Sequence, residues 1–318
     1  MQVHHLPGPL PVFNKAVITI GTFDGVHSGH CQILQQLKAE ARAIGGETVI
    51  ITFEPHPRKL LGKQPAEIKL INTPQEKITL LAQQGIDHLV VVPFTREFAN
   101  QSAREYVENF LVERFHPHTI IIGYDHQFGH NREGNYLLLE ALKDEYGFEV
   151  KEISEQVIDN VIISSTKVRQ SITEGNIDEA NLFLGYPYFF EGTVVEGNRL
   201  GRTIGFPTAN IEISTPEKLV PGDGVYAVTV SLLSKEDLLY SGMMNIGIRP
   251  TIGGTKRVIE VNIFDFDADI YGCVLRVFIH RRLRGEVKFN GLEELKEQLN
   301  RDKIQSINAL AELQANIS

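Results

Sequence analysis

Between residues 21 and 30 the chain reads Gly21-Thr22-Phe23-Asp24-Gly25-Val26-His27-Ser28-Gly29-His30. A short apolar, β-rich run precedes this stretch at residues 16–20, and apolar residues at helical spacing follow it from residue 33 to residue 44. The stretch therefore predicts a strand-to-helix junction with both histidines in the first turn. Because His27 and His30 are three residues apart, they share one helical face beside unpaired backbone N–H groups and the positive end of the helix dipole. We expect this junction to bind phosphate.

The alternation of strand and helix continues to about residue 153. Further β-rich runs lie at residues 47–53, 88–94, 119–123 and 148–153, with helical segments between them. Two of these segments open on capping boxes, at residues 73–76 and 102–105. Continuous apolar strands fit a parallel sheet covered on both faces, and ligands of such sheets bind beyond the carboxyl ends of the strands. The two histidines follow the first strand and belong to that edge.

The pattern changes after residue 153. Two helical pieces are expected at about residues 165–174 and 176–184. Five β-rich runs then follow, separated by Gly, Pro and Asp turns, at residues 189–195, 224–233, 238–246, 257–264 and 274–283. They predict an antiparallel barrel or sandwich, and residues 291–313 predict one or two helices lying on it. We place the boundary at Tyr186, which gives domains of residues 1–186 and 187–318.

Composition excludes several classes of protein. The formal charge of -9 on 318 residues argues against a sequence-independent nucleic-acid binder, which needs Lys and Arg to neutralise phosphates. No stretch approaches the ~20 continuous apolar residues of a membrane span, and the first residues lack the pattern of a secretory signal. Cys31 and Cys273 lie far apart without a neighbouring partner, so a disulfide framework is not expected. The composition predicts a cytoplasmic protein and leaves its oligomeric state open.

A second glycine-rich stretch, Leu200-Gly201-Arg202-Thr203-Ile204-Gly205-Phe206-Pro207-Thr208-Ala209-Asn210, stands in the second half. Thr208 and Asn210 are two residues apart, so on an extended segment their oxygens face one way and can share Mg²⁺ with ATP phosphates. Gly201 and Gly205 would let the backbone approach the nucleotide. A Gly/Pro turn with polar ends is the structural alternative.

Both stretches resemble known signatures. Residues 21–30 resemble the H-x-G-H signature of the nucleotidylyltransferase superfamily, and in the longer form G-x-F-D-G-V-H-x-G-H they resemble the N-terminal module of the bifunctional riboflavin kinase/FAD synthetases of bacteria. The resemblance implies that His27 and His30 act on the triphosphate of ATP, while Gly25 and Gly29 allow close backbone approach. The alternatives are a His pair that caps a helix and a metal-binding pair.

Two further segments of the first half resemble the same family. Residues 163–169 are similar to its S-S-T-x-x-R element, which implies that Ser165 and Thr166 bind phosphate and that Arg169 acts on the leaving pyrophosphate. Residues 123–129 are similar to its G-x-D-x-x-F-G segment, which implies that Asp125 binds the flavin nucleotide or ribose and that Phe128 stacks on a ring. The alternatives are a capped helix with solvated cations and a strand-ending turn with a packed Phe.

The second half resembles the kinase module of that family. Residues 201–210 are close to the riboflavin kinase signature G-R-x-x-G-F-P-T-A-N. Residues 259–266 resemble its E-x-H-x-x-D-F strand, which implies that Glu260 is the base that takes the proton of a primary alcohol. Asn262 stands where that pattern has His. Residues 242–251 also resemble the family, and Asn245 is expected to reach nucleotide or flavin.

The resemblance implies a fold and a pair of reactions. The fold is a nucleotidylyltransferase domain, Rossmann-like with a parallel sheet, followed by an antiparallel β-barrel with a C-terminal helix. Riboflavin and ATP would give FMN in the barrel, and FMN and ATP would give FAD and pyrophosphate in the first domain, both with Mg²⁺. Two alternatives stay open: adenylylation of another phosphorylated or acidic substrate, and a flavin-sensing binding protein without turnover. An assay with riboflavin, ATP and Mg²⁺ separates them.

Overall fold

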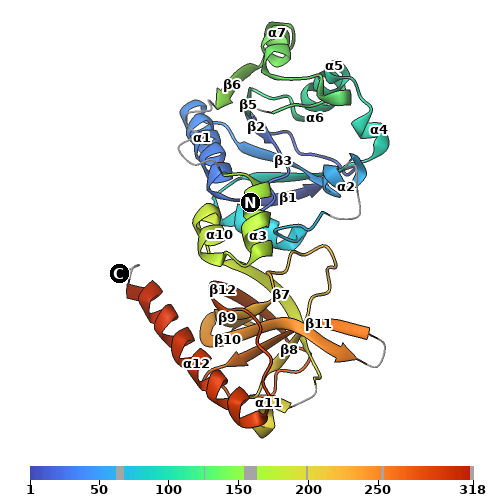
Figure 1. The fold of residues 1–318 in the computed structure, drawn as a ribbon. Helices are drawn as coiled ribbons and strands as arrows, with labels where there is room; N and C mark the ends of the chain where they lie inside the picture. The colour runs from blue at the N-terminus through green and yellow to red at the C-terminus, as the bar shows by residue number, and fades with distance from the viewer. Residues whose placement is uncertain (62–67, 125, 154–162, 198–199, 252–253, 316–318) are drawn as a thin grey trace. The chain divides into compact units, whose positions relative to one another are not determined.

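The computed structural model describes residues 1–61, 68–124, 126–153, 163–197, 200–251 and 254–315 (Figure 1). The chain divides into two compact units, Met1–Ser165 and Thr166–Ser318. This division lies before the two helices that precede the barrel, whereas the boundary predicted from the sequence at Tyr186 lies after them. The boundary at Tyr186 stays a prediction of where the first functional domain ends and the second begins. Each unit is described by itself below.

The first unit contains one six-stranded sheet in which every neighbouring pair of strands is parallel. Its strands are β1 (Gln2–His5), β2 (Val17–Ile20), β3 (Thr48–Glu54), β4 (His88–Pro93), β5 (Thr119–Gly123) and β6 (Glu149–Ile153), in the order β1-β4-β3-β2-β5-β6. Five of the six strands were predicted. The sixth, β1, is mostly exposed and has Val3 as its one aliphatic residue, so it has no apolar pattern to detect.

The helices of this unit follow the predicted alternation. They are α1 (Ser28–Ile44), α2 (Pro57–Leu61), α3 (Pro74–Gln83), α4 (Arg96–Ala99), α5 (Ala103–Glu105), the π-helical turn η2 (Tyr106–Val112), α6 (Glu113–Phe115), the 3-10 turn η3 (His130–Arg132) and α7 (Tyr136–Tyr146). Both predicted capping boxes are present. At the start of α3, Glu76 N–H donates to Thr73 Oγ1 at 3.2 Å, and Thr73 N–H donates to Glu76 Oε2 at 2.8 Å.

The strand order sets the functional edge of the sheet. Strands β2, β3 and β4 follow one another to one side, and the chain then returns to place β5 on the other side of β2. The direction of winding therefore reverses between β2 and β5, and ligands of such sheets bind in the crevice beyond the carboxyl ends of the strands at this point. The loop that carries His27 follows β2, and the segment that carries Phe128 follows β5.

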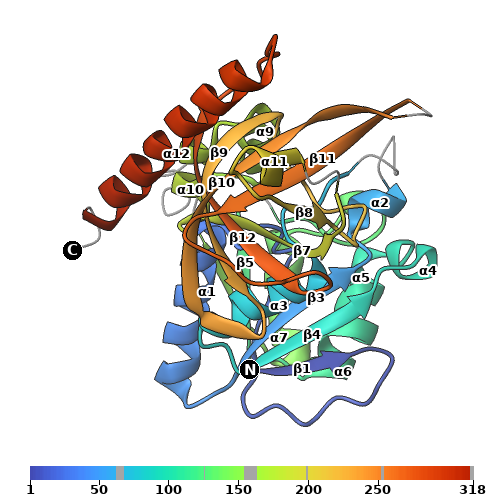
Figure 2. The same ribbon diagram turned by 90° about the horizontal axis from the view of Figure 1, so that it is seen from below.

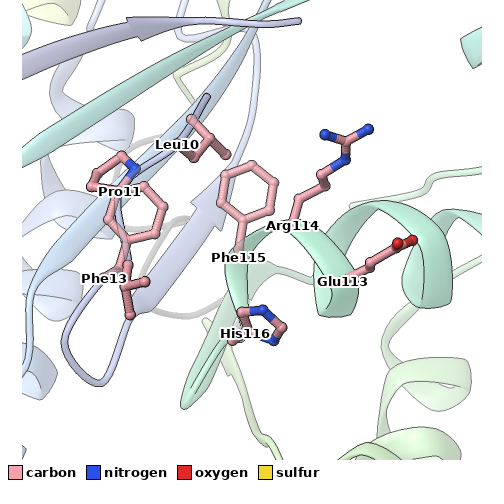
Figure 3. Close-up of a pocket in the computed structure, with 8 residues that line it drawn as sticks. Leu10, Pro11, Phe13, Glu113, Arg114, Phe115 and His116 are labelled. Atoms are coloured by element: carbon pink, nitrogen blue, oxygen red, sulfur yellow. The ribbon is translucent and has the colours of Figure 1, made fainter. Parts of the chain in front are cut away.

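A cavity of about 260 Å³ lies at the amino ends of the strands, opposite the loop that carries His27 (Figure 3). Its lining comes from the segments before β2 and before β5, namely residues 10–13 and 113–116. The rings of Phe13 and Phe115 are nearly parallel there, with centroids 6.2 Å apart. Because these segments enter the amino ends of the strands, the cavity is separate from the His27 edge.

The second unit is a closed antiparallel barrel preceded by two helices. The helices are α9 (Ser165–Glu174) and α10 (Ile177–Leu184). The strands are β7 (Tyr188–Val195), β8 (Ala209–Glu212), β9 (Gly224–Leu232), β10 (Lys235–Thr251), β11 (Gly254–Ile263) and β12 (Val274–Arg284), and the short helix α11 (Leu200–Thr203) lies between β7 and β8. The barrel closes in the order β10-β11-β8-β7-β12-β9. The structure thus selects a barrel over a sandwich. It also adds the four-residue strand β8, which the sequence pattern did not predict.

One long helix, α12 (Leu292–Ala315), follows the barrel where the sequence predicted one or two. It packs against β9, β10 and β12, and both ribbon views show it alongside the barrel (Figures 1 and 2). Its Ala309 and Leu310 bury against Ala227 of β9. Asp302, fully buried, accepts three hydrogen bonds from the Arg284 guanidinium: Nε donates to Oδ1 at 2.9 Å and to Oδ2 at 3.2 Å, and Nη2 donates to Oδ2 at 2.6 Å. Within the described residues, no helix is both long and apolar enough to cross a membrane.

Candidate active sites

The loop after β2 contains residues whose backbone angles are unfavourable for their side chains. Phe23, Gly25 and Val26 all have positive φ angles, of 47°, 95° and 38°. Glycine adopts such angles freely, but Phe and a β-branched Val do so at a cost of about 1–3 kcal/mol each, which surrounding structure must offset. Strained backbone of this kind gathers at ligand-binding sites. The loop delivers His27 to the position just before α1.

His27 caps α1 and contacts Ser165, the last residue of the first unit. Its Nδ1 accepts the backbone N–H of His30 at 3.4 Å, and its Nε2 lies 3.4 Å from Ser165 Oγ. The Ser165 hydroxyl donates to the carbonyl of Asp24 at 2.9 Å, so its lone pair faces His27 Nε2. Because Nδ1 accepts a hydrogen bond, this pattern makes Nε2 the ring nitrogen that donates toward Ser165 Oγ. Ser165, predicted from sequence to bind phosphate, is therefore brought against the imidazole pair.

His27 and His30 form the predicted pair. Their rings are stacked, with centroids 3.7 Å apart and planes inclined by 15°. Burial lowers the pKa of His30 well below 6.5, and the charges of His27 and Lys77 lower it further, so His30 is neutral at pH 7. Its Nδ1 is buried and has no hydrogen-bond partner among the residues that the structure describes. A buried polar atom without a partner is costly, and a phosphate oxygen that accepts from it would remove that cost.

Gly25 and Gly29 each have a local reason to be glycine. Gly25 has the positive φ already described. At Gly29, a Cβ would lie 3.3 Å from Cε1 and Nδ1 of the His27 ring and 3.7 Å from the carbonyl oxygen of Ile163. A side chain at Gly29 would therefore crowd the imidazole.

Lys77 is a neighbour of this site that sequence reasoning missed. Its Nζ donates at 3.1 Å to the carbonyl of Thr22, after β2, and at 3.1 Å to the hydroxyl of Thr52, on β3. Burial lowers the pKa of Lys77, while Asp24 and Glu54 act in the opposite direction. Lys77 lies in the first turn of α3. The capping box predicted that turn, but nothing in the sequence connects it with the loop after β2.

The positions of the other residues predicted for the first site say less about their predicted roles in binding. Phe128 is 7 % exposed and its ring stacks on Tyr106, with centroids 5.1 Å apart, so part of its surface is already covered by protein. Asp125 lies outside the described residues. Thr166, exposed, and Arg169, partly buried, lie on α9 and belong to the second unit. Their roles toward phosphate stay proposals.

In the barrel, three predicted residues stand side by side on adjacent strands. Asn245 of β10 pairs with Glu260 of β11, and Glu260 pairs in turn with Asn210 of β8. Directly opposed residues have Cβ atoms about 5 Å apart and face the same side of the sheet. The neighbouring pair, Met244 and Val261, is fully buried and fills the other side. Because side chains alternate along a strand, the row of Asn245, Glu260 and Asn210 faces the outside of the barrel.

Two charged residues extend this row. Arg249 of β10 donates from Nη2 to Glu260 Oε2 at 3.3 Å and from Nη1 to Glu286 Oε1 at 2.9 Å. Gly247 leaves room for this arrangement, since a Cβ there would lie 1.7 Å from Glu286 Oε1. The guanidinium therefore holds the Glu260 carboxylate beside Asn210. Sequence reasoning did not connect Glu286 with Glu260, because Glu286 lies 26 residues later and belongs to no shared motif.

The loop before β8 is closely folded. Phe206 N–H donates to the carbonyl of Gly201 at 2.8 Å, and a Cβ on Gly201 would lie 2.2 Å from the Phe206 carbonyl oxygen and 3.6 Å from Thr208 Oγ1. Gly205 has a φ of 85°. The loop thus brings bare backbone to Thr208, next to Asn210. The hydroxyl and amide oxygens of this pair suit Mg²⁺, which commonly takes one or two protein ligands together with substrate phosphates.

Comparison with known proteins matches both units. The FAD synthetase family model matches residues 11–167 and the riboflavin kinase family model matches residues 184–310. Proteins named bifunctional riboflavin kinase/FMN adenylyltransferase are 39 % identical in Escherichia coli K12, over 91 % of this chain and 90 % of that one, and 38 % identical in Haemophilus influenzae, over 92 % and 93 %. A crystal structure described as a macrolide-efflux protein from Streptococcus pneumoniae is 33 % identical, with a TM-score of 0.82 over 93 % of this chain and 94 % of that one.

The parallel-sheet unit and the barrel, each with its own polar cluster, define a two-module transferase. The similarity covers nine-tenths of the chain and runs through both modules. The chain belongs to the family of bifunctional riboflavin kinase/FMN adenylyltransferases.

Proposed function

We propose that this chain makes FAD from riboflavin in two steps. In the first, riboflavin and ATP give FMN and ADP in the barrel. In the second, FMN and ATP give FAD and pyrophosphate in the parallel-sheet unit. The observation that carries the proposal is the register that sets Glu260 opposite Asn210, because a carboxylate beside oxygen ligands for metal-bound phosphate is what phosphorylation of an alcohol needs.

In the kinase step, the Glu260 carboxylate accepts the proton of the riboflavin primary hydroxyl. The oxygen then bonds to the γ-phosphorus of ATP as the bond from that phosphorus to the bridging oxygen breaks, and ADP leaves. Thr208 and Asn210 are the residues that would hold Mg²⁺. When bound, Mg²⁺ neutralises charge on the phosphate oxygens. Asn245, in the same row as Glu260, is positioned to orient nucleotide or flavin.

In the adenylyltransferase step, an oxygen of the FMN phosphate bonds to the α-phosphorus of ATP, and pyrophosphate leaves. The nucleophile is already ionised, so the protein needs donors and alignment rather than a base. We assign His27, His30 and Ser165 to the ATP phosphates, and Thr166 and Arg169 to phosphate and the departing pyrophosphate. The neutral His30 supports this assignment, since its buried Nδ1 finds no hydrogen-bond partner in the described part of the chain. We also propose a cytoplasmic location, which the two free cysteines support.

The test uses Glu260→Ala and the isosteric Glu260→Gln in the full-length protein. With riboflavin, ATP and Mg²⁺ supplied, we expect FMN formation to fall by about 10²- to 10⁴-fold in both variants, the range associated with loss of a general base. FAD formation from supplied FMN should stay at the wild-type rate, because the Glu260 row and the His27 pair belong to separate units. Products are resolved by chromatography.

Four outcomes would contradict the proposal. Loss of both activities would refute separate sites, and full FMN formation by Glu260→Gln would remove the role of Glu260 as base. Wild-type protein that binds flavin without any turnover would identify a sensor, and turnover of another phosphorylated substrate in place of FMN would identify a different adenylyltransferase.

A further inference from the structure

We propose that Asn262 is a positioning residue for the kinase reaction, which fixes the loop that carries Thr208 by holding the carbonyl of Pro207. The proposal rests on the proposed kinase function of the barrel. It concerns the position at which this chain has Asn in place of the His of the family pattern.

The geometry at the end of the β8–β11 ladder carries the proposal. Glu260 pairs with Asn210 and Val261 pairs with Ala209, and the ladder stops there. One step further along the same antiparallel register, Asn262 stands opposite Thr208. In place of another backbone pair, the Asn262 side chain makes the contact: its Nδ2 donates to the Pro207 carbonyl oxygen at 2.6 Å.

This hydrogen bond is strongly favoured where it lies. Asn262 is 7 % exposed, so its amide is shielded from competing water. A buried amide without a partner is costly, and the Pro207 carbonyl satisfies one of the two N–H donors of Asn262. The strand that carries Asn262 is fixed on its other side by β10, where Met243 is its register partner. The donor therefore belongs to a rigid element and the acceptor to a loop.

The bond controls the orientation of Thr208. The carbonyl of Pro207 belongs to the peptide unit that continues into the Thr208 nitrogen, and a peptide unit is planar. Fixing that oxygen fixes the plane from which the Thr208 side chain projects. At its other end, the loop is held by the Phe206 N–H bond to Gly201. Asn262 also lies two residues from Glu260, so both side chains project from one face of β11. One face thus supplies the base and holds the loop of the proposed metal ligands.

The experiment compares Asn262→Asp, Asn262→Ala and Asn262→His in the full-length protein. Asn262→Asp keeps the shape but replaces the N–H donor with an oxygen that repels the Pro207 carbonyl. The matched control is Asn181→Asp, which removes the same kind of bond elsewhere on the barrel, from Asn181 Nδ2 to the Ile279 carbonyl at 2.9 Å. Asn181 Oδ1 also accepts Tyr188 N–H, and Asp can keep that contact.

Two readouts are measured. The first is the KM for ATP and the kcat of FMN formation, at several Mg²⁺ concentrations, with FAD formation from supplied FMN as the internal control. We expect Asn262→Asp and Asn262→Ala to raise the KM for ATP by about tenfold or more and to need more Mg²⁺, with FAD formation unchanged. Asn262→His keeps an N–H donor at this position, so its KM for ATP should stay within about threefold of the wild-type value. Asn181→Asp should match wild type.

The second readout is amide hydrogen exchange of residues 203–212, which does not depend on activity. We expect faster exchange there in Asn262→Asp and Asn262→Ala, with the rest of β11 unchanged. Wild-type exchange and wild-type KM in both variants would overturn the proposal. If Asn262→Asp loosens the whole barrel, Asn262→Ala decides. If the wild-type protein makes no FMN, the kinase function fails, while the exchange result still decides whether Asn262 holds the loop.

Discussion

The two ring nitrogens of His27 have different partners in the structure. Nδ1 caps the helix through the His30 backbone and Nε2 faces Ser165. The spacing of three residues was enough to predict that His27 and His30 share a face, because helix geometry alone decides it. The same argument could not find Lys77. Its contacts with Thr22 and Thr52 join segments that are 55 and 25 residues away in the chain, and no local pattern encodes them.

A second histidine, His280 of β12, gives a prediction about pH. Burial lowers its pKa to about 4, and its Nε2 lies 2.8 Å from Thr229 Oγ1. The folded barrel thus binds this proton less readily than the unfolded chain, whose His has a pKa near 6.5. The contribution of His280 to stability is complete above about pH 6.5 and is lost as the pH falls from 6.5 toward 4. At pH 5 the loss from this group is about 2 kcal/mol.

The check uses His280→Gln, which keeps a polar group for Thr229 but does not titrate. Hydrogen-exchange protection of β9 and β12 is measured at pH 7.5 and pH 5. We expect the wild-type barrel to lose about 2 kcal/mol more protection than the variant over this interval. Equal losses in the two proteins would show that His280 is not the group responsible.

At the scale of elements, the periodic segments were predicted and the short or polar ones were not. The strands β2 to β6 and the helices α9, α10 and α12 have apolar patterns long enough to recognise. By contrast, β8 has four residues and is held largely by its neighbours: it pairs with β7 on one side and with only two residues of β11 on the other. The choice between barrel and sandwich also needed the structure, because closure depends on pairings between strands distant in sequence.

The helix α12 is joined to the barrel by a buried ion pair between Asp302 and Arg284 of β12. Asp302 is fully buried, and it also accepts a hydrogen bond from Gln298 Nε2 at 2.9 Å. Removing one partner of such a pair leaves the other charge without compensation, which costs about 3–5 kcal/mol. We expect Asp302→Ala to lower the free energy of unfolding of the barrel unit by about this amount and to increase hydrogen exchange along α12.

The control for α12 is Glu297→Ala on the same helix. Glu297 pairs with Arg301 at 3.6 Å, but both side chains are mostly exposed. An exposed pair of this kind contributes about 0–1 kcal/mol. If urea unfolding shows similar losses for Asp302→Ala and Glu297→Ala, then the Arg284 contact is not what holds α12.

At the scale of the whole molecule, each unit has its own core and its own polar cluster. The sequence indicated this division through its change of period, from alternating strands and helices to closely spaced strands. The boundary predicted at Tyr186 placed α9 and α10 at the end of the first domain, whereas the contacts divide the chain between Ser165 and Thr166. Contacts such as that of Asn181 with β12 assign α10 to the barrel.

The separation of sites predicts complementation between inactive chains. His30→Ala protein should convert riboflavin only to FMN, and Glu260→Ala protein should make neither product from riboflavin. Mixed in solution, the two should make FAD after a lag, because FMN released by the first chain can enter the intact site of the second. A mixture that stops at FMN, although Glu260→Ala protein accepts added FMN, would mean that FMN does not leave the chain that makes it.

The short strand β1 has a consequence for the behaviour of the protein during synthesis and purification. It covers β4 along residues 88–91, so that the sheet ends on this side in a brief, polar strand with two histidines. Without it, the carbonyls and amides of an apolar strand would be free to pair with those of another molecule. Four residues outside both candidate sites would then protect the dispersed protein against aggregation, and a tag joined to them would be best placed on a flexible spacer.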